Sequence, residues 1–275
     1  MDTLNTEACL QAADLISQAD GLLITAGAGM GVDSGLPDFR GEQGFWKAYP
    51  ALGKLGMRFA DIASPRAFRT DPTLAWGFYG HRLQLYRSIV PHAGFQALIE
   101  IGASMPNGAF VFTSNVDGQF QKAGFDAGRV AECHGSIHLM QCLAPCSDAV
   151  WTADLADPVI DMEAGRMVSA LPVCPHCGGL ARPNILMFND GGWHERRSEQ
   201  QETRLHAWQA RLSRPVVMEI GAGTAIPSVR IFGEQLGCPI VRINLREHGV
   251  ALVRDIGIAM GARETIEQIG AILRK

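Results

Sequence analysis

The chain has 275 residues, of which 47% are hydrophobic and 19% charged, enough to bury the core of one large domain or of a domain with a satellite module. A formal net charge of -4 gives no broad attraction to nucleic acids or anionic membranes, and we expect neither as a partner. Residues 1–7 are acidic and do not resemble a secretory signal, and no apolar run approaches the roughly 20 residues of a membrane helix. We therefore expect a cytoplasmic protein, whose seven cysteines serve as metal ligands or buried thiols.

An amphipathic helix over residues 8–16 is predicted to lead into an apolar strand that begins at Leu22. The strand enters a loop with Gly27, Gly29 and Gly31. Glycine leaves backbone amides accessible, so the loop suits a phosphate group, although tight turns also use glycine for steric reasons. Residues 35–41, Gly-Leu-Pro-Asp-Phe-Arg-Gly, break any helix within about two turns. This break disfavours a nicotinamide redox enzyme, whose glycine turn runs straight into a long helix.

Residues 45–87 are rich in aromatic side chains and arginine, and prolines at 50, 65 and 72 divide them into short segments. The pattern predicts a helical insertion between two strands, with most of the aromatic side chains in its core.

Polar residues follow the next apolar strand, which spans residues 109–113. Ser114, Asn115 and Asp117 stand at its carboxyl end, where open α/β sheets bind ligands, although Asn and Asp also cap helices at such turns. His134 follows a short strand at residues 129–130. An isolated histidine is usually structural, but an unperturbed pKa of about 6.5 makes imidazole a suitable general base near neutrality.

Two cysteine pairs, Cys142 with Cys146 and Cys174 with Cys177, flank a 27-residue insertion. Such pairs are typical of a closed, tetrahedral four-cysteine zinc ribbon. Because all four positions hold thiolates, we expect a structural zinc ion rather than a catalytic one.

Two further apolar strands, at residues 216–220 and 240–244, precede a closing helix at residues 265–273. The first runs into Gly221, Ala222 and Gly223, and the second ends on Asn244. The order of elements predicts an α/β fold with a Rossmann-like parallel sheet flanked by helices.

From Leu22 to Asn244 these motifs resemble, in order, those of the sirtuins, which are NAD-consuming protein deacylases. The resemblance rests on residues 26–41, 113–120, 134–136, 179–190, 221–224 and 243–244. It implies NAD as cofactor, structural zinc, and an acylated protein or peptide as substrate, and it leaves the oligomeric state open. It also implies a Rossmann-like domain of residues 1–44, 88–137 and 184–275. A small domain then combines the helical insertion, residues 45–87, with the zinc ribbon, residues 138–183.

The resemblance also assigns roles to residues. His134 is the implied catalytic base, Asn115 holds the nicotinamide ribose and the attacking water, and Asp117 binds the nicotinamide carboxamide. Phe39 is implied to shield the reacting centre from water. The implied cofactor-binding residues are Gly27, Ala28, Gly29, Asp38, Phe39, Arg40, Ser114, Asn115, Asp117, Gly221, Gly223, Thr224, Asn244 and Ala262.

Substrate contacts are implied for Ile185 and Phe188, in the segment that pairs its backbone with the peptide. Tyr79 and Arg82 match the Tyr-x-x-Arg spacing of sirtuins that favour acidic acyl groups such as succinyl and malonyl. A guanidinium group can donate two parallel hydrogen bonds to a carboxylate.

Several residues depart from the family pattern. Ser114 replaces a glutamine, Phe120 a histidine, Ala222 and Gly223 a Thr-Ser pair, and residues 189–190, Asn-Asp, a Gly-Glu pair. The departures at residues 114 and 222–223, together with Gly31, keep an ADP-ribosyltransferase or NAD glycohydrolase as an alternative. A non-catalytic NAD or ADP-ribose sensor is a second alternative.

Overall fold

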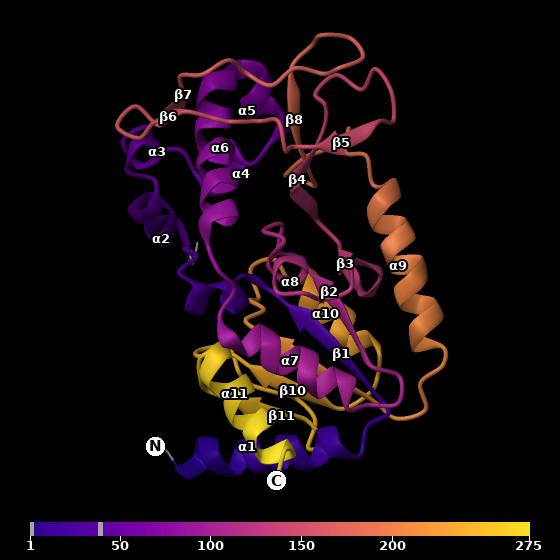
Figure 1. The fold of residues 1–275 in the computed structure, drawn as a ribbon. Coiled ribbons are helices and arrows are strands. Elements are labelled where there is room, and N and C mark those ends of the chain that lie inside the picture. Colours follow the sequence, from indigo (N-terminus) through magenta and orange to yellow (C-terminus); the bar gives the residue numbers. More distant parts are fainter. Residues whose placement is uncertain (1–2, 38–40) are drawn as a thin grey trace.

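A six-stranded parallel sheet forms the larger part of the molecule (Figure 1). The computed structural model describes residues 3–37 and 41–275, so Asp38, Phe39 and Arg40, which were expected to bind the cofactor, lie outside the described residues. In spatial order the strands are β11 (Ile256–Ile258), β10 (Ile240–Ile243), β9 (Pro215–Ile220), β1 (Gly21–Ala26), β2 (Ala109–Thr113) and β3 (Val130–Glu132). The strand order reverses between β1 and β9. In open α/β sheets, the carboxyl ends of the strands at such a reversal form the ligand crevice.

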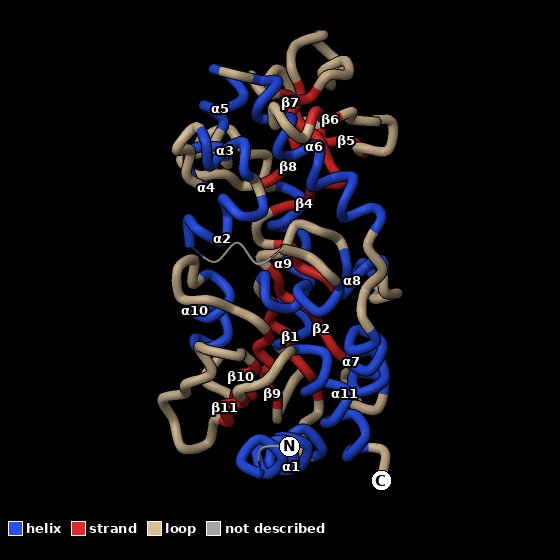
Figure 2. Tube along the Cα trace, turned by 90° about the vertical axis from the view of Figure 1, so that its left-hand side faces the viewer, coloured by secondary structure: helices blue, strands red, loops and turns tan. Residues whose placement is uncertain are grey.

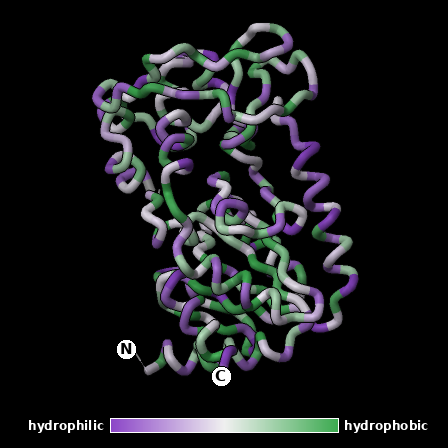
Figure 3. Tube along the Cα trace, in the orientation of Figure 1, coloured by the Kyte–Doolittle hydropathy of each residue, from purple (hydrophilic) through white to green (hydrophobic). Residues whose placement is uncertain are grey.

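Helices cover both faces of this sheet (Figures 1 and 2). One face packs against α1 (Thr3–Ser17), α7 (Ala93–Ala103) and α11 (Ala262–Leu273), and the other against α9 (Arg196–Gln209) and α10 (Ser228–Gln235). In β1, Leu22 and Ile24 enter the first core and Leu23 enters the second. Strands covered on both faces are mostly apolar, and Figure 3 shows much hydrophobic chain in the part of the molecule that holds this sheet.

A smaller module lies at the carboxyl ends of the strands (Figure 1). Its helices are α2 (Gly41–Ala48), α3 (Pro50–Lys54), α4 (Phe59–Ile62), α5 (Pro65–Thr70) and α6 (Pro72–Ser88). Each of the three prolines predicted to divide this region begins a helix, where its missing N–H leaves no hydrogen bond unmade.

The rest of the module is an antiparallel sheet in the order β5 (Val150–Thr152), β4 (Gly135–Cys142) and β8 (Ala181–Ile185), with a hairpin of β6 (Ile160–Asp161) and β7 (Arg166–Met167). Helices and sheet share one aromatic core, and the buried Trp76 donates from Nε1 to the carbonyl of Ala181 at 3.0 Å. The predicted fold class is therefore confirmed, whereas the exact domain boundaries stay a prediction. Across residues 3–37 and 41–275, no helix combines the length and the apolar character that crossing a bilayer requires.

Candidate active site

The loops that follow β1 and β9 pack directly against each other. After β1, Ala28–Ser34 forms a 3-10 helix, η1. A Cβ atom on Gly29 would lie 2.6 Å from Cα of Gly221, and one on Gly27 would lie 2.8 Å from Cα of Ala222. Any side chain at these positions would force the two loops apart. Glycine is thus required here for close packing between loops.

The amides of this loop differ from the sequence-based expectation. Gly27 donates its N–H to the carbonyl of Ile220, and Gly29 donates to that of Gly221, both at 3.0 Å. The interpretation that these glycines leave their amides free for phosphate is therefore wrong for Gly27 and Gly29. Their binding of the cofactor stays a prediction that rests on the shape of the loop.

The loop after β2 joins the same site. Asn115 donates from Nδ2 to the carbonyl of Gly27 at 2.9 Å, and Ser114 donates its N–H to that of Ala26 at 3.2 Å. Thr113 also donates to Ala26, from Oγ1 at 2.8 Å. The loops after β1, β2 and β9 thus meet at one edge of the sheet, as their positions at strand ends predict.

Asp117 lies deep in this edge, with 7% of its surface exposed. Its Oδ1 accepts the N–H of Gln119 at 2.8 Å, and its carbonyl accepts Nε2–H of His138 on β4 at 2.9 Å. Burial raises the pKa of the Asp117 carboxyl from 3.8 to about 6. The negative charge of Glu132 adds to this increase, whereas the N–H of Gln119 and the charge of Arg82 oppose it.

His134 lies between β3 and β4 and is half-buried. Gly135 after it has φ 76°, and a side chain there would collide with the carbonyl of Asn184 on β8, so the fold requires glycine directly after His134. Burial lowers the pKa of the His134 imidazole below its usual value of 6.5. The imidazole is therefore neutral at pH 7, as a proton acceptor must be.

Ser228, the first residue of α10, places Oγ 3.3 Å from Nε2 of His134. In the tautomer with its proton on Nδ1, the imidazole accepts a hydrogen bond from this hydroxyl. Sequence analysis missed Ser228 because no motif marks it. The only signal was its place shortly after β9, at the carboxyl edge of the sheet.

A pocket beside the glycine loop brings together Gly29, Gly221, Asn244 and Ala262. Its empty volume is about 450 Å³, part of it open to solvent. Its remaining lining residues are Val32, Asp33, Ile243, Leu245, Arg246, Met260 and Gly261. Four of the residues expected to bind the cofactor, from four separate segments, thus line one cavity.

Two polar side chains near this pocket are engaged within the protein. Asn244 donates from Nδ2 to the carbonyl of Ala222 at 2.9 Å, and its Oδ1 accepts the N–H groups of Arg246 and Glu247, each at 3.0 Å. Thr224 donates its hydroxyl to Oε1 of Glu247 at 2.9 Å. Asn244 thus fixes the turn after β10. The role of Thr224 in cofactor binding stays a prediction.

Arg82 on α6 lies in an aromatic cage and is 8% exposed. Its Nε donates to the hydroxyl of Tyr86 at 2.9 Å, and its guanidinium carbon lies 5.2 Å from the ring centre of Phe78 and 5.8 Å from that of Tyr79. Tyr79 is 1% exposed and stacks on Phe68. The phenol that holds Arg82 is therefore Tyr86, one helical turn further on, which the Tyr-x-x-Arg spacing does not reveal.

The loop after β8 is held by an ion pair between Arg182 and Asp190, whose side chains are 1% and 0% exposed. The two N–O distances are 2.7 and 2.9 Å. Among the described non-glycine residues, only Asn189 has a positive φ, 55°, a conformation that glycine adopts freely. The Asn-Asp pair thus keeps a backbone shape that suits Gly-Glu. In the same segment Ile185 is buried, whereas Phe188 is 36% exposed and donates its N–H to the carbonyl of Ala63.

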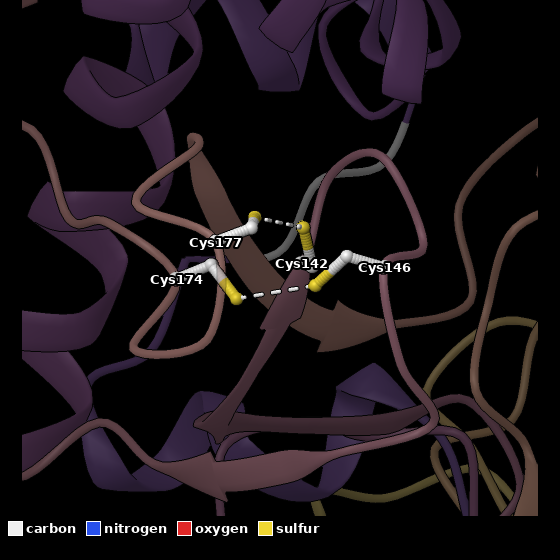
Figure 4. A group of neighbouring side chains, drawn as sticks. All are labelled: Cys142, Cys146, Cys174 and Cys177. Carbon is white, nitrogen blue, oxygen red and sulfur yellow. Dashed lines mark hydrogen bonds between the residues drawn. The ribbon is translucent and has the colours of Figure 1, made fainter.

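Four thiols meet at the far end of β4 (Figure 4). Cys142 and Cys177 are 3.7 Å apart at sulfur, Cys146 and Cys174 are 3.6 Å apart, and all four sulfur atoms lie within 4.8 Å of one another. These distances exclude disulfides, whose bond is about 2.05 Å. Zinc with Zn–S bonds of about 2.3 Å places its ligands about 3.8 Å apart. The donor set and its spacing therefore fit structural zinc.

Comparisons with known proteins agree with this geometry. The family model described as "Sir2 family" matches residues 27–243. An "NAD-dependent protein deacylase 1" of Pseudomonas aeruginosa is 31% identical, over 84% of this chain and 85% of that protein. An "NAD-dependent protein deacylase" of Thermococcus kodakarensis is 29% identical, over 94% and 93%. The solved structure of a Sir2 homologue in complex with NAD superposes with a TM-score of 0.72 at 24% identity, covering 96% of this chain and 93% of that one.

Proposed function

Because this chain belongs to the Sir2 family, we propose that it removes acyl groups from protein lysine side chains at the expense of NAD, giving nicotinamide and O-acyl-ADP-ribose. The match to the Sir2 family model confirms the resemblance to sirtuins. One observation carries the proposal. The segment 221–228 contacts the glycine loop at its beginning and His134 at its end. A nucleotide in the crevice between these loops has its sugar beside the imidazole.

The chain's own groups fit this chemistry. NAD supplies, when bound, an electrophilic sugar carbon and hydroxyl groups that take up the acyl group. His134 accepts a hydroxyl proton at Nε2, and its lowered pKa keeps it neutral and able to do so. Asn115 and Asp117 orient the nicotinamide end. The pocket lined by Asn244 and Ala262 holds the adenosine end.

We extend the proposal to the substrate. The peptide lies along β8 and the loop containing Phe188, on the side of the small module that faces the six-stranded sheet. Arg82 favours an acyl chain that ends in a carboxylate, because its guanidinium group is held at a fixed place by the hydroxyl of Tyr86 and by three aromatic rings, one of them that of Tyr86 itself. A reduced four-thiolate zinc site suits the cytoplasm, where we place the protein.

A product assay tests this proposal. Purified protein is mixed with NAD and with acetyl-lysine or succinyl-lysine peptides, and products are identified by mass spectrometry. We expect free lysine peptide and O-acyl-ADP-ribose, both lost in His134→Ala. A heavier protein product indicates ADP-ribosyl transfer, NAD loss without peptide indicates hydrolysis, and absence of any product indicates a sensor. Arg82→Met should lower desuccinylation far more than deacetylation, and equal losses would contradict the acyl preference.

A further inference from the structure

Gln119 has a buried carboxamide that the fold leaves without a partner. The residue is 2% exposed and begins the short helix α8 (Gln119–Lys122). Among the described residues, neither Nε2 nor Oε1 of its side chain makes a hydrogen bond. Leaving a buried polar group unpaired destabilises a protein, and such groups are rare in native structures. Two unpaired polar atoms in one buried side chain indicate that a ligand binds there.

The carboxamide lies against the glycine loop. A Cβ atom on Gly31 would be 3.0 Å from Nε2 of Gln119 and 2.8 Å from Cδ1 of Leu36. Any side chain at residue 31 would press on the amide, so Gly31 leaves it free. The backbone N–H of the same residue is donated to Oδ1 of Asp117 at 2.8 Å. Residue 119 thus contacts the glycine loop through its side chain and belongs to the turn that holds the buried carboxylate.

The chemistry of this arrangement points to a particular ligand group. A carboxamide presents one acceptor and one donor side by side in a plane. A second primary carboxamide, placed edge to edge, satisfies both at once, and its remaining N–H is available to a carboxylate such as that of Asp117. We propose that Gln119 binds the carboxamide of nicotinamide, with Asp117 as the second acceptor. This inference rests on the proposed function, because the nicotinamide end of NAD is the part that it places here.

Nicotinamide itself is the probe. Its binding to the zinc-loaded protein in the presence of ADP-ribose is measured by saturation-transfer NMR and calorimetry, and KM for NAD and for the acyl peptide are measured in parallel. In Gln119→Leu we expect nicotinamide affinity to fall and KM for NAD to rise, each roughly tenfold, with KM for the peptide unchanged. Gln209→Leu on α9 is the matched control, because Nε2 of Gln209 is also unpartnered, and it should bind nicotinamide as the wild type does.

A second variant keeps the test valid if Gln119→Leu does not fold. Gly31→Ala should displace the amide and weaken nicotinamide severalfold. The inference is overturned if Gln119→Leu binds nicotinamide within twofold of the wild type, or if the wild type does not bind nicotinamide. Binding does not require turnover. A wild type that binds nicotinamide through Gln119 but frees no lysine therefore contradicts the proposed function and supports this inference.

Discussion

The buried carboxyl of Asp117 should lower the free energy of unfolding at neutral pH, and Asp117→Asn should raise it again. The carboxyl is 7% exposed, and burial raises its pKa from 3.8 to about 6. An acid whose folded-state pKa is raised favours the folded protein only while it is protonated. The contribution of Asp117 to stability is therefore most favourable at low pH and falls as pH rises from about 4 to about 6, after which the full cost persists.

The size of the effect follows from the two pKa values. One pH unit corresponds to about 1.4 kcal/mol, so ionised Asp117 costs about 3 kcal/mol at pH 8 and about half of that at pH 5. Asparagine has no charge to bury, and its Oδ1 still accepts the N–H of Gln119. The variant should exceed the wild type in free energy of unfolding by up to about 3 kcal/mol at pH 8.

Urea unfolding of zinc-loaded wild type and variant, at pH 5 and pH 8, measures this difference. The slope of free energy against urea should be the same in both proteins, because the surface exposed on unfolding is unchanged. The reasoning is refuted if the variant is no more stable at pH 8, or if the difference between the two proteins does not grow between pH 5 and pH 8.

Three further predictions follow from other contacts. Asp190→Ala should destabilise the protein by about 3–5 kcal/mol, because it leaves the buried Arg182 without a counter-ion. Ser228→Ala should lower kcat/KM roughly fivefold, because it removes the hydroxyl that bonds Nε2 of His134 and holds the imidazole in place. Cys174→Ser should abolish the single bound zinc ion measured by mass spectrometry and loosen β4 and β8 in hydrogen exchange.

Each of these has a matched control. The double variant Arg182→Met with Asp190→Leu should recover most of the lost stability, and a cost of Asp190→Ala below about 1 kcal/mol would contradict the argument. Ser228→Thr should restore kcat/KM, and an unchanged kcat/KM in Ser228→Ala would exclude a role for the hydroxyl. Cys238→Ser, whose thiol is not part of the cluster, should keep its zinc, and zinc retained by Cys174→Ser would rule out the four-cysteine site.

Local signals in the sequence predict the main elements well. The apolar run at residues 109–113 is β2, that at 216–220 lies in β9, and the prolines of the insertion begin helices. Apolar runs and prolines act on their own neighbourhood, so they can be interpreted without the fold. By contrast, β11 spans only Ile256–Ile258, too short a run to predict.

Contacts between distant segments are what the sequence does not reveal. Gly27 and Gly29 were expected to leave their amides accessible, but the carbonyls of Ile220, at the end of β9, and of Gly221, just after it, accept both N–H groups. The pairing of His134 with Ser228 joins residues 94 positions apart. Such partners depend on which loops the sheet order brings together, and no local pattern encodes that order.

Substitution patterns can also mislead. Asn189 and Asp190 depart from the family's Gly-Glu pair, and such a departure suggests a changed loop. In the structure Asn189 adopts a positive φ, 55°, and Asp190 pairs with Arg182. Asparagine tolerates the left-handed region better than most residues, so the backbone can be kept although the residues change.

The stoichiometry of the reaction tests the central claim most directly. With acyl peptide present, nicotinamide and free lysine are quantified together for the wild type and for His134→Ala. The account predicts one nicotinamide released for each lysine freed, with both lost in the variant. Nicotinamide released at the same rate without peptide, or lysine freed without NAD, would contradict it.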